Sequence, residues 1–376
     1  MKRASLIVCG VLLVFEMLGC GLVFERQQPA REAPGTTEIC LWAGNKQAAI
    51  SLTFDDALLG PTQTYVQLLN ARDMQGTFFV PTDWIDNPDA EIKDYANVDV
   101  DHGTWADWRA FAAHGHEIAS HTHTHPHLAE LESEDEIREE LHLPKQILDR
   151  ELAPLRCLTI GFPYGSSDER VQRIAADYYI AGRAPQGINT ARPPDFYAIK
   201  RLSPRSDTAL STMTGWVDEA IAQRGWLMVT FHGIDGVAWE PLPRERFVQF
   251  LDSVQNRREN LWVAPFLSLV KYIRERESAR VSDVSVAAEK ITFLLTDDLP
   301  DDIYNEPLTL TTCVPQEWKE VQVIQSNFIQ CVNVRGDDGV TYVLYEAVPD
   351  QGRIHIIPIK KDFSLKPGQG SMSEGG

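Results

Sequence analysis

Short apolar runs alternate with segments of helical spacing between Ala48 and Glu277, and this alternation limits the fold to very few classes. The predicted strands are 48–54, 76–80, 117–119, 157–160, 179–182, 226–231 and 261–263. The predicted helices are 61–71, 104–114, 133–143 with a kink or restart at Pro144, 168–177, 208–224, 244–255 and 265–277. Repeated strand–helix units imply parallel strands, arranged either as an open sheet or as a barrel.

Residues with chemically active side chains follow several of these strands. Asp55 and Asp56 end the first strand, His121 follows the third, Tyr164 follows the fourth, and His232 ends the strand at 226–231. In open parallel sheets and in barrels, the functional site lies at the carboxyl ends of the strands. The strands were predicted from apolar runs alone, so the sequence independently predicts a site at this edge.

Four of the ten histidines lie together in the segment SHTHTHPHL, at positions 121, 123, 125 and 127. Imidazole and carboxylate are the ligands that a catalytic zinc or similar divalent ion takes. Both His121 with His125 and His123 with His127 have a spacing that fits one helical turn, so spacing alone does not choose between them. Each feature also has a structural explanation when taken alone, such as turn chemistry for the Asp pair.

Four motifs together resemble the polysaccharide deacetylases, the NodB-homology group of carbohydrate esterase family 4. They are TFDD at 53–56, GHEIASHTHTHP at 115–126, FPYG at 162–165 and an apolar strand that ends in His232. The resemblance extends over about 39–276 and implies an α/β fold, a distorted, incomplete (β/α) barrel.

The resemblance also implies a bound divalent cation, most simply Zn²⁺. The residues that match the ligands of the family are Asp56, His121 and His125, whereas His123 and His127 match no ligand position.

The catalytic roles implied by the resemblance fall on three further residues. Asp55 matches the base that takes a proton from water, and His232 matches the acid that protonates the leaving group. Tyr164 matches the residue whose backbone N–H stabilises the oxyanion. The implied reaction is hydrolysis of an acetyl group with assistance from a metal ion.

The sequence departs from the family pattern in two places. Gly161 stands where the family has an arginine that orients the base, and Arg201 could supply that charge from another strand. An Asp-Trp motif is absent between Tyr179 and Arg224, and Asp195 is a candidate replacement for it.

The expected substrate is an N- or O-acetylated polysaccharide of the cell envelope or of the exterior. Two alternatives are a hydrolase of a non-sugar C–N bond and a noncatalytic carbohydrate-binding lipoprotein. Trp84, Trp105 and Trp239 lie in predicted loops where their rings could hold sugars or pack in the core. With 35 Lys and Arg against 54 Asp and Glu, the net charge of −19 argues against nucleic acid as a partner.

The first 20 residues have the layout of a secretory leader, with a basic start and a short apolar run. Cys20 after Leu-Gly resembles a lipobox, which predicts a lipoprotein anchored to the membrane at Cys20 in the cell envelope. Plain secretion and an uncleaved anchor are the alternatives, although Glu16 would be costly inside a membrane span. Residues 21–38 are predicted to be a linker and 39–280 the catalytic domain.

After residue 280 the sequence changes to β-branched runs, the first of them at Ile291–Leu295. We therefore predict a small all-β, sandwich-like domain over 281–361, with a hairpin turn at Asp337–Gly339, followed by a flexible tail at 362–376. Cys313 and Cys331 could form a disulfide here in an oxidising compartment, and two isolated buried thiols are the alternative.

Overall fold

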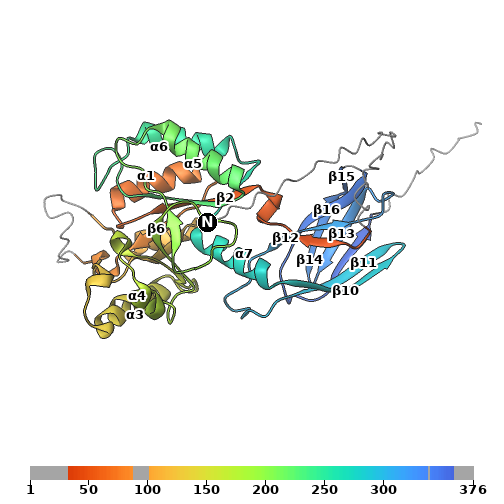
Figure 1. Cartoon of the computed structure of the whole chain (residues 1–376), viewed down its shortest axis with the longest axis horizontal. Helices are drawn as coiled ribbons and strands as arrows, with labels where there is room; N and C mark the ends of the chain where they lie inside the picture. Colours follow the sequence, from red (N-terminus) through yellow and green to blue (C-terminus); the bar gives the residue numbers. More distant parts are fainter. Residues whose placement is uncertain (1–32, 88–100, 338, 360–376) are drawn as a thin grey trace, which may run out of the picture.

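The computed structural model describes residues 33–87, 101–337 and 339–359, which form two lobes side by side (Figure 1). The predicted leader with Cys20 and the predicted tail lie outside these residues. None of the helices in the described ranges combines the length and apolar character needed to cross a bilayer.

The larger lobe is built around a parallel sheet that curls into a nearly closed barrel. Its strand order is β7-β6-β5-β4-β3-β2-β8, and β9 pairs with the first half of β2. Beyond the end of β7, Leu202 forms a parallel bridge with Val229 of β8, which brings the two ends of the sheet together. The strands are β2 (Ala48–Phe54), β3 (Thr77–Val80), β4 (Glu117–Ser120), β5 (Thr159–Gly161), β6 (Ala181–Gln186), β7 (Ile199–Arg201), β8 (Trp226–Phe231) and β9 (Leu261–Val263).

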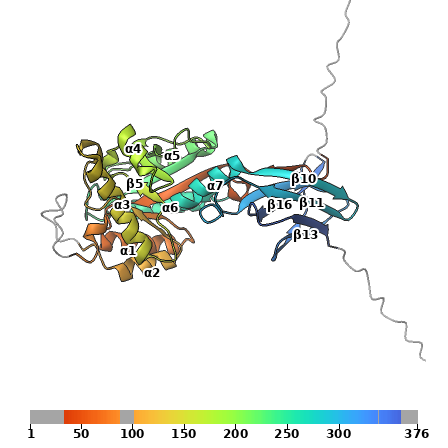
Figure 2. The same ribbon diagram turned by 90° about the horizontal axis from the view of Figure 1, so that it is seen from below.

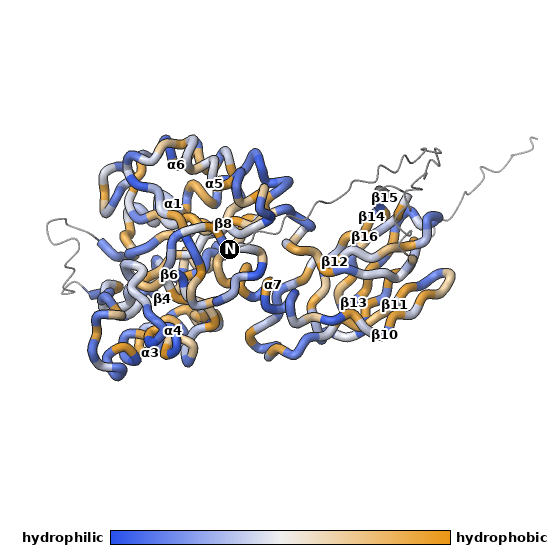
Figure 3. The backbone as a smooth tube through the Cα atoms, in the orientation of Figure 1, coloured by the Kyte–Doolittle hydropathy of each residue, from blue (hydrophilic) through white to orange (hydrophobic). Residues whose placement is uncertain are grey.

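Helices cover the outside of the barrel, because alternate strand residues face outward and are apolar. Ile50, Leu52 and Phe54 of β2 belong to the buried cluster shared with these helices. Hydrophobic segments follow the strands of both lobes in Figure 3. The helices are α1 (Leu59–Asn70), α2 (Trp105–Ala113), α3 (Glu134–Glu151), α4 (Glu169–Ala175), α5 (Leu210–Gln223), α6 (Arg244–Gln255) and α7 (Phe266–Ser278).

The predicted interruption at Pro144 is wrong, since α3 runs through it. Pro144 is buried on the same side as Leu141 and Leu148, so apolar packing offsets the lost backbone hydrogen bond. The helix starts were better predicted. The Ser133 side chain accepts hydrogen bonds from the N–H groups of Asp135 and Glu136, and Thr104 forms a capping box at the start of α2.

The second lobe consists of two antiparallel sheets around a separate apolar core, which agrees with the predicted all-β architecture. Figure 2 shows α7 between this lobe and the barrel. One sheet has the order β1-β12-β16-β15 and the other β10-β11-β17-β13-β14. The strands are β1 (Thr37–Ile39), β10 (Arg280–Ala287), β11 (Lys290–Thr296), β12 (Leu308–Cys313), β13 (Glu320–Gln325), β14 (Phe328–Asn333), β15 (Arg335–Asp337), β16 (Val340–Ala347) and β17 (Ile354–Pro358).

Two features of this lobe, the pairing of its first strand and the state of its cysteines, could not be read from the sequence. Strand β1 precedes the barrel in sequence but pairs with β12. The β lobe is therefore built from segments on both sides of the barrel in the sequence. Cys313 is buried in β12, whereas Cys331 is exposed in β14 of the other sheet, and no disulfide joins them. The disulfide alternative is therefore wrong, and of the two thiols predicted to be buried only Cys313 is.

Candidate active site

Strand β2 supplies both aspartates through the alternation of its side chains. Phe54 points outward into the core under the helices, so its neighbour Asp55 points into the barrel. The Asp55 N–H donates to the Phe231 carbonyl at 3.0 Å, which extends the β2–β8 ladder by one residue. The chain then turns sharply at Asp56, whose φ is +73°, a value that Asp adopts more readily than most residues. Both carboxylates are buried.

Strand β4 ends in the loop that carries the histidines. This loop is not helical, and residues with positive φ, among them Thr122 and His125, fold it back over the barrel. His121 and His125 are buried and face the aspartates. His123 is held elsewhere by the Thr82 hydroxyl, 2.9 Å from its Nδ1, and the His127 ring stacks on Tyr164. The structure thus brings together one of the two pairs that spacing left open.

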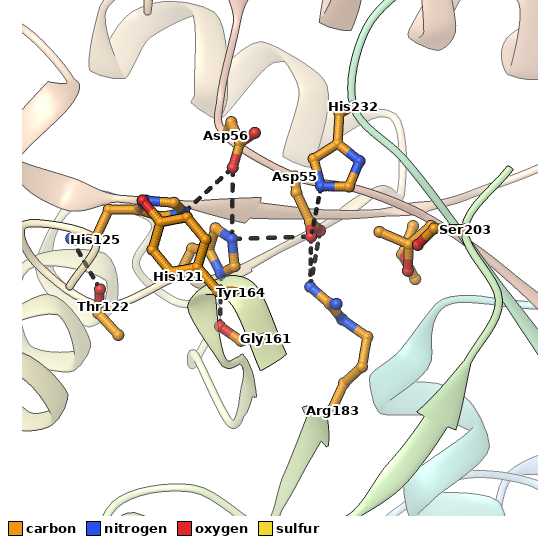
Figure 4. Close-up of polar contacts among 12 residues, drawn as sticks. Asp55, Asp56, His121, Thr122, His125, Gly161, Tyr164, Arg183, Ser203 and His232 are labelled. Atoms are coloured by element: carbon orange, nitrogen blue, oxygen red, sulfur yellow. Dashed lines mark hydrogen bonds and ion pairs between the residues drawn. The ribbon is translucent and has the colours of Figure 1, made fainter. Parts of the chain in front are cut away.

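Asp56, His121 and His125 form a group whose ligand atoms all lie within 4.8 Å of one another. Asp56 Oδ1 is 3.5 Å from Nε2 of His121 and 3.4 Å from Nε2 of His125 (Figure 4). Ligands of a tetrahedral zinc ion lie roughly 3.3 Å apart, since each bond is about 2 Å long. The spacing and chemistry of the three donors therefore fit a divalent cation.

The remaining ring nitrogens of both histidines are already engaged. Nδ1 of His121 lies 2.5 Å from the Gly161 carbonyl oxygen, and Nδ1 of His125 lies 3.0 Å from the Tyr164 hydroxyl. With Nδ1 as the donor in each contact, a neutral ring presents the lone pair of Nε2 toward Asp56, as a metal ligand must, whereas a protonated ring donates its Nε2–H to Asp56. Such contacts fix the tautomer and orientation of metal-binding histidines.

A buried arginine holds Asp55. Nη2 of Arg183 donates to both Asp55 oxygens at 2.8 and 2.7 Å, and the Arg183 side chain has no exposed surface. Nε2 of His232 lies 3.6 Å from Asp55 Oδ2 on the other side (Figure 4). Asp55 therefore lies between a fixed cation and an imidazole.

The two aspartates keep their charge despite burial. Burial raises the pKa of Asp55, but the charges of Arg183, His121 and His232 together hold it below its usual value. Burial likewise raises the pKa of Asp56, and hydrogen bonds from His121 and His125 outweigh it, so the pKa lies well below normal. Burial lowers the pKa of His121, which favours the neutral imidazole that a metal ion needs.

Arg183 was not predicted as a site residue. It provides the positive charge beside Asp55 that an arginine at position 161 would otherwise provide. Gly161 and Arg183 are register partners on β5 and β6. A Cβ at position 161 would lie only 2.4 Å from Arg183 Nη2, so the guanidinium fits because residue 161 is glycine. The available signal was a single charged residue directly after the apolar run at 179–182, beside a glycine on the neighbouring strand.

The two suggested replacements do not fill the expected roles. Arg201 reaches the site, but its Nη1 donates to Ser203 at 2.5 Å and not to Asp55. Asp195 lies outside the set of residues that line the cavity, and its side chain accepts from the backbone N–H of Tyr197.

One cavity of about 370 Å³ unites the site. Tyr164 and Trp239, which line this cavity, are both 48% exposed. The centroids of the Trp239 and His232 rings are 4.7 Å apart. Trp84 is instead buried against His125, and Trp105 is partly buried against the core. The cavity is lined by Asp55, Asp56, His121, His125, Tyr164, Arg201, His232 and Trp239.

Residues 43–181 match a family model described as polysaccharide deacetylase, which confirms the resemblance seen in the motifs. A protein from a Bacillus species named gellan lyase is 28% identical over 358 residues, which is 86% of this chain and 13% of that protein. The chain thus spans about an eighth of this relative.

Two solved structures are similar at low sequence identity. A candidate polysaccharide deacetylase from Mycobacterium smegmatis is 16% identical with a TM-score of 0.47, covering 64% of this chain and 94% of that one. A pseudoenzyme of carbohydrate esterase family 4 from Bacillus anthracis is 17% identical with a TM-score of 0.41, covering 60% and 66%.

Proposed function

We propose that this chain, which carries a polysaccharide deacetylase domain, is a metal-dependent hydrolase that removes acetyl groups from a polysaccharide. One observation carries the proposal. Asp56, His121 and His125 share a single cavity with His232 and with Asp55, which Arg183 holds from behind the cavity wall. Binding a glycan needs neither a buried charged aspartate nor a neighbouring imidazole, so this arrangement favours catalysis over a binding-only role.

Asp56, His121 and His125 would hold the divalent cation. When bound, such an ion polarises the acetyl carbonyl and makes water more acidic. The donor set of one carboxylate and two imidazoles suits Zn²⁺ and leaves room for further ligands.

The protein's own groups would move the protons. Asp55 accepts a proton from the attacking water, and Arg183 keeps its carboxylate charged and correctly oriented. His232 donates a proton to the departing sugar oxygen or nitrogen. The backbone N–H of Tyr164 donates a hydrogen bond to the oxyanion and so stabilises its negative charge. The products are acetate and a deacetylated sugar.

The proposal is tested by acetate release from a panel of acetylated glycans. Chitin oligomers, peptidoglycan fragments, acetylated xylan and acetylated exopolysaccharides cover N- and O-linked acetyl groups. We expect acetate from at least one of them. A cyclic amide would serve as the control for hydrolysis of a non-sugar C–N bond, and activity on that control alone would contradict the proposal.

Replacing Gly161 by Ala should displace Arg183, because the new methyl group would overlap its Nη2. We expect a loss of about 1–3 kcal/mol in the free energy of unfolding, together with slower acetate release. Gly215→Ala in α5 is a matched control, since nothing lies within 4 Å of the added Cβ and alanine stabilises helices by about 0.5–1 kcal/mol. Denaturant unfolding measures the free energy of unfolding of both variants. Equal changes in the two would show that the added methyl group at position 161 does not overlap Arg183.

Replacing Tyr164 by Phe should weaken metal binding, because His125 Nδ1 loses its contact with the Tyr164 hydroxyl while the backbone N–H of residue 164 remains. Outer contacts of this type contribute about 10–100-fold to metal affinity. Competition with a chromogenic chelator measures the change. An unchanged affinity would show that the Tyr164 hydroxyl does not support His125.

A further inference from the structure

Arg201 is a cavity-lining cation that the proposed chemistry does not use. Among the described residues its guanidinium forms no ion pair. Nη1 donates to Ser203, and Gln186 accepts from Nη1 at 3.1 Å with its amide oriented to suit both groups. Nε is buried without a hydrogen-bond partner among those residues. In contrast, Arg183 is bound to Asp55, and Arg205 outside the cavity lies 3.7 Å from Glu240.

The carboxylates of the cavity are bound to other groups and compensate the charge of Arg201 only in part. Asp55 is neutralised by Arg183, and Asp56 faces two imidazoles that would share a cation with it. Burial and then the nearby Arg183 lower the pKa of Arg201 to about 10, the charges of Asp55 and Asp56 offset only part of this, and Arg201 stays charged at neutral pH. A partly buried cation without a counterion favours an anionic ligand, and a guanidinium matches the planar geometry of a carboxylate.

The fold places Arg201 on the His232 side of the site. Arg201 ends β7, and the next residue, Leu202, pairs with β8, the strand that leads to His232. His121 and His125 follow β4, which is separated from β7 by two strands. Figure 4 shows Ser203, the partner of Arg201, on the His232 side and away from His125. A group that His232 protonates therefore belongs to the part of the substrate nearest Arg201 and Trp239.

We propose that Arg201 binds a carboxylate on the sugar chain that carries the acetyl group, so that the preferred substrate is an acetylated acidic polysaccharide such as a uronate polymer. This inference rests on the proposed deacetylase function, which it narrows. The exposed ring of Trp239 would support the sugar ring beside this carboxylate.

Binding tests the inference without relying on turnover. The probe is an acetylated oligouronide, and its match is the same oligosaccharide with each carboxylate reduced to a hydroxymethyl group. Calorimetry with the full chain should show about tenfold or greater preference for the acidic form. Arg201→Gln should remove this preference by weakening binding of the acidic form about 10–100-fold while leaving the neutral form within about twofold.

Arg205→Gln is the matched control, because it removes the same charge from a side chain that is 66% exposed and outside the cavity lining. It should keep the preference. Equal affinity of the unaltered protein for both oligosaccharides, or equal losses in the Arg201 and Arg205 variants, would overturn the inference.

Acetate is a second carboxylate that could reach Arg201, and inhibition by added acetate distinguishes the two sources. If Arg201→Gln relieves acetate inhibition but does not change the preference between oligosaccharides, Arg201 binds the product and the inference is wrong. A failure of the proposed function looks different, since no acetylated glycan would then release acetate from the unaltered protein.

Discussion

Replacing Asp55 by Asn should lower the rate of acetate release on the order of 10³-fold while the metal ion stays bound. The amide has nearly the shape of the carboxylate but cannot accept the proton of the attacking water, and a general base contributes about 10²–10⁴-fold. The metal group of Asp56, His121 and His125 remains intact. Acetate release and metal content, measured on the same preparation, separate the two effects.

Asp55→Asn also leaves the buried Arg183 without its counterion, so the variant should unfold more easily. Thermal unfolding must therefore be measured beside activity, at a temperature where both proteins are folded. Asp83→Asn is a suitable control, since Asp83 does not line the cavity. Its Oδ1 lies 3.9 Å from Nε2 of His123, so this substitution also removes a carboxylate beside an imidazole. A near-normal rate in folded Asp55→Asn would remove Asp55 from the role of base.

Replacing His125 by Ala should remove metal and activity together. The substitution deletes one of three protein ligands, and the two that remain cannot close a tetrahedral site. We expect at least about a hundredfold weaker metal affinity and acetate release near background. Metal content after dialysis and acetate release report the two losses.

His123→Ala is the matched control, because His123 belongs to the same loop but is bound to Thr82. It should retain both metal and activity. If His125→Ala kept its metal, or if His123→Ala lost it, the ligand assignment would be wrong.

Much of the barrel could be predicted from sequence because its strands are buried on both faces. Ala48–Phe54 and Trp226–Phe231 are buried at every residue, and such runs stand out as continuous apolar segments. Strand β7 has only three residues and two of them are charged, so no apolar run marked it, although Arg201 itself was expected on a strand. Strand β10 has mostly exposed residues, and β1 is paired with a strand more than 250 residues later, so neither gives a local signal.

The site, too, was predictable only in part. The ends of β2, β4 and β8 placed Asp55, His121 and His232 at one edge without any alignment. Residue spacing did not reveal which histidines converge, because positive φ values in the loop decide it. Arg183 needed knowledge that β5 and β6 are neighbours in register, which only the folded sheet provides.

The dependence of acetate release on a stoichiometric metal ion tests the central claim most directly. The protein would be stripped with a chelator, dialysed, and titrated with Zn²⁺ while acetate release from its best glycan is recorded. We expect activity to fall to background after stripping and to return fully at about one ion per chain. Undiminished acetate release from metal-free protein would contradict the account.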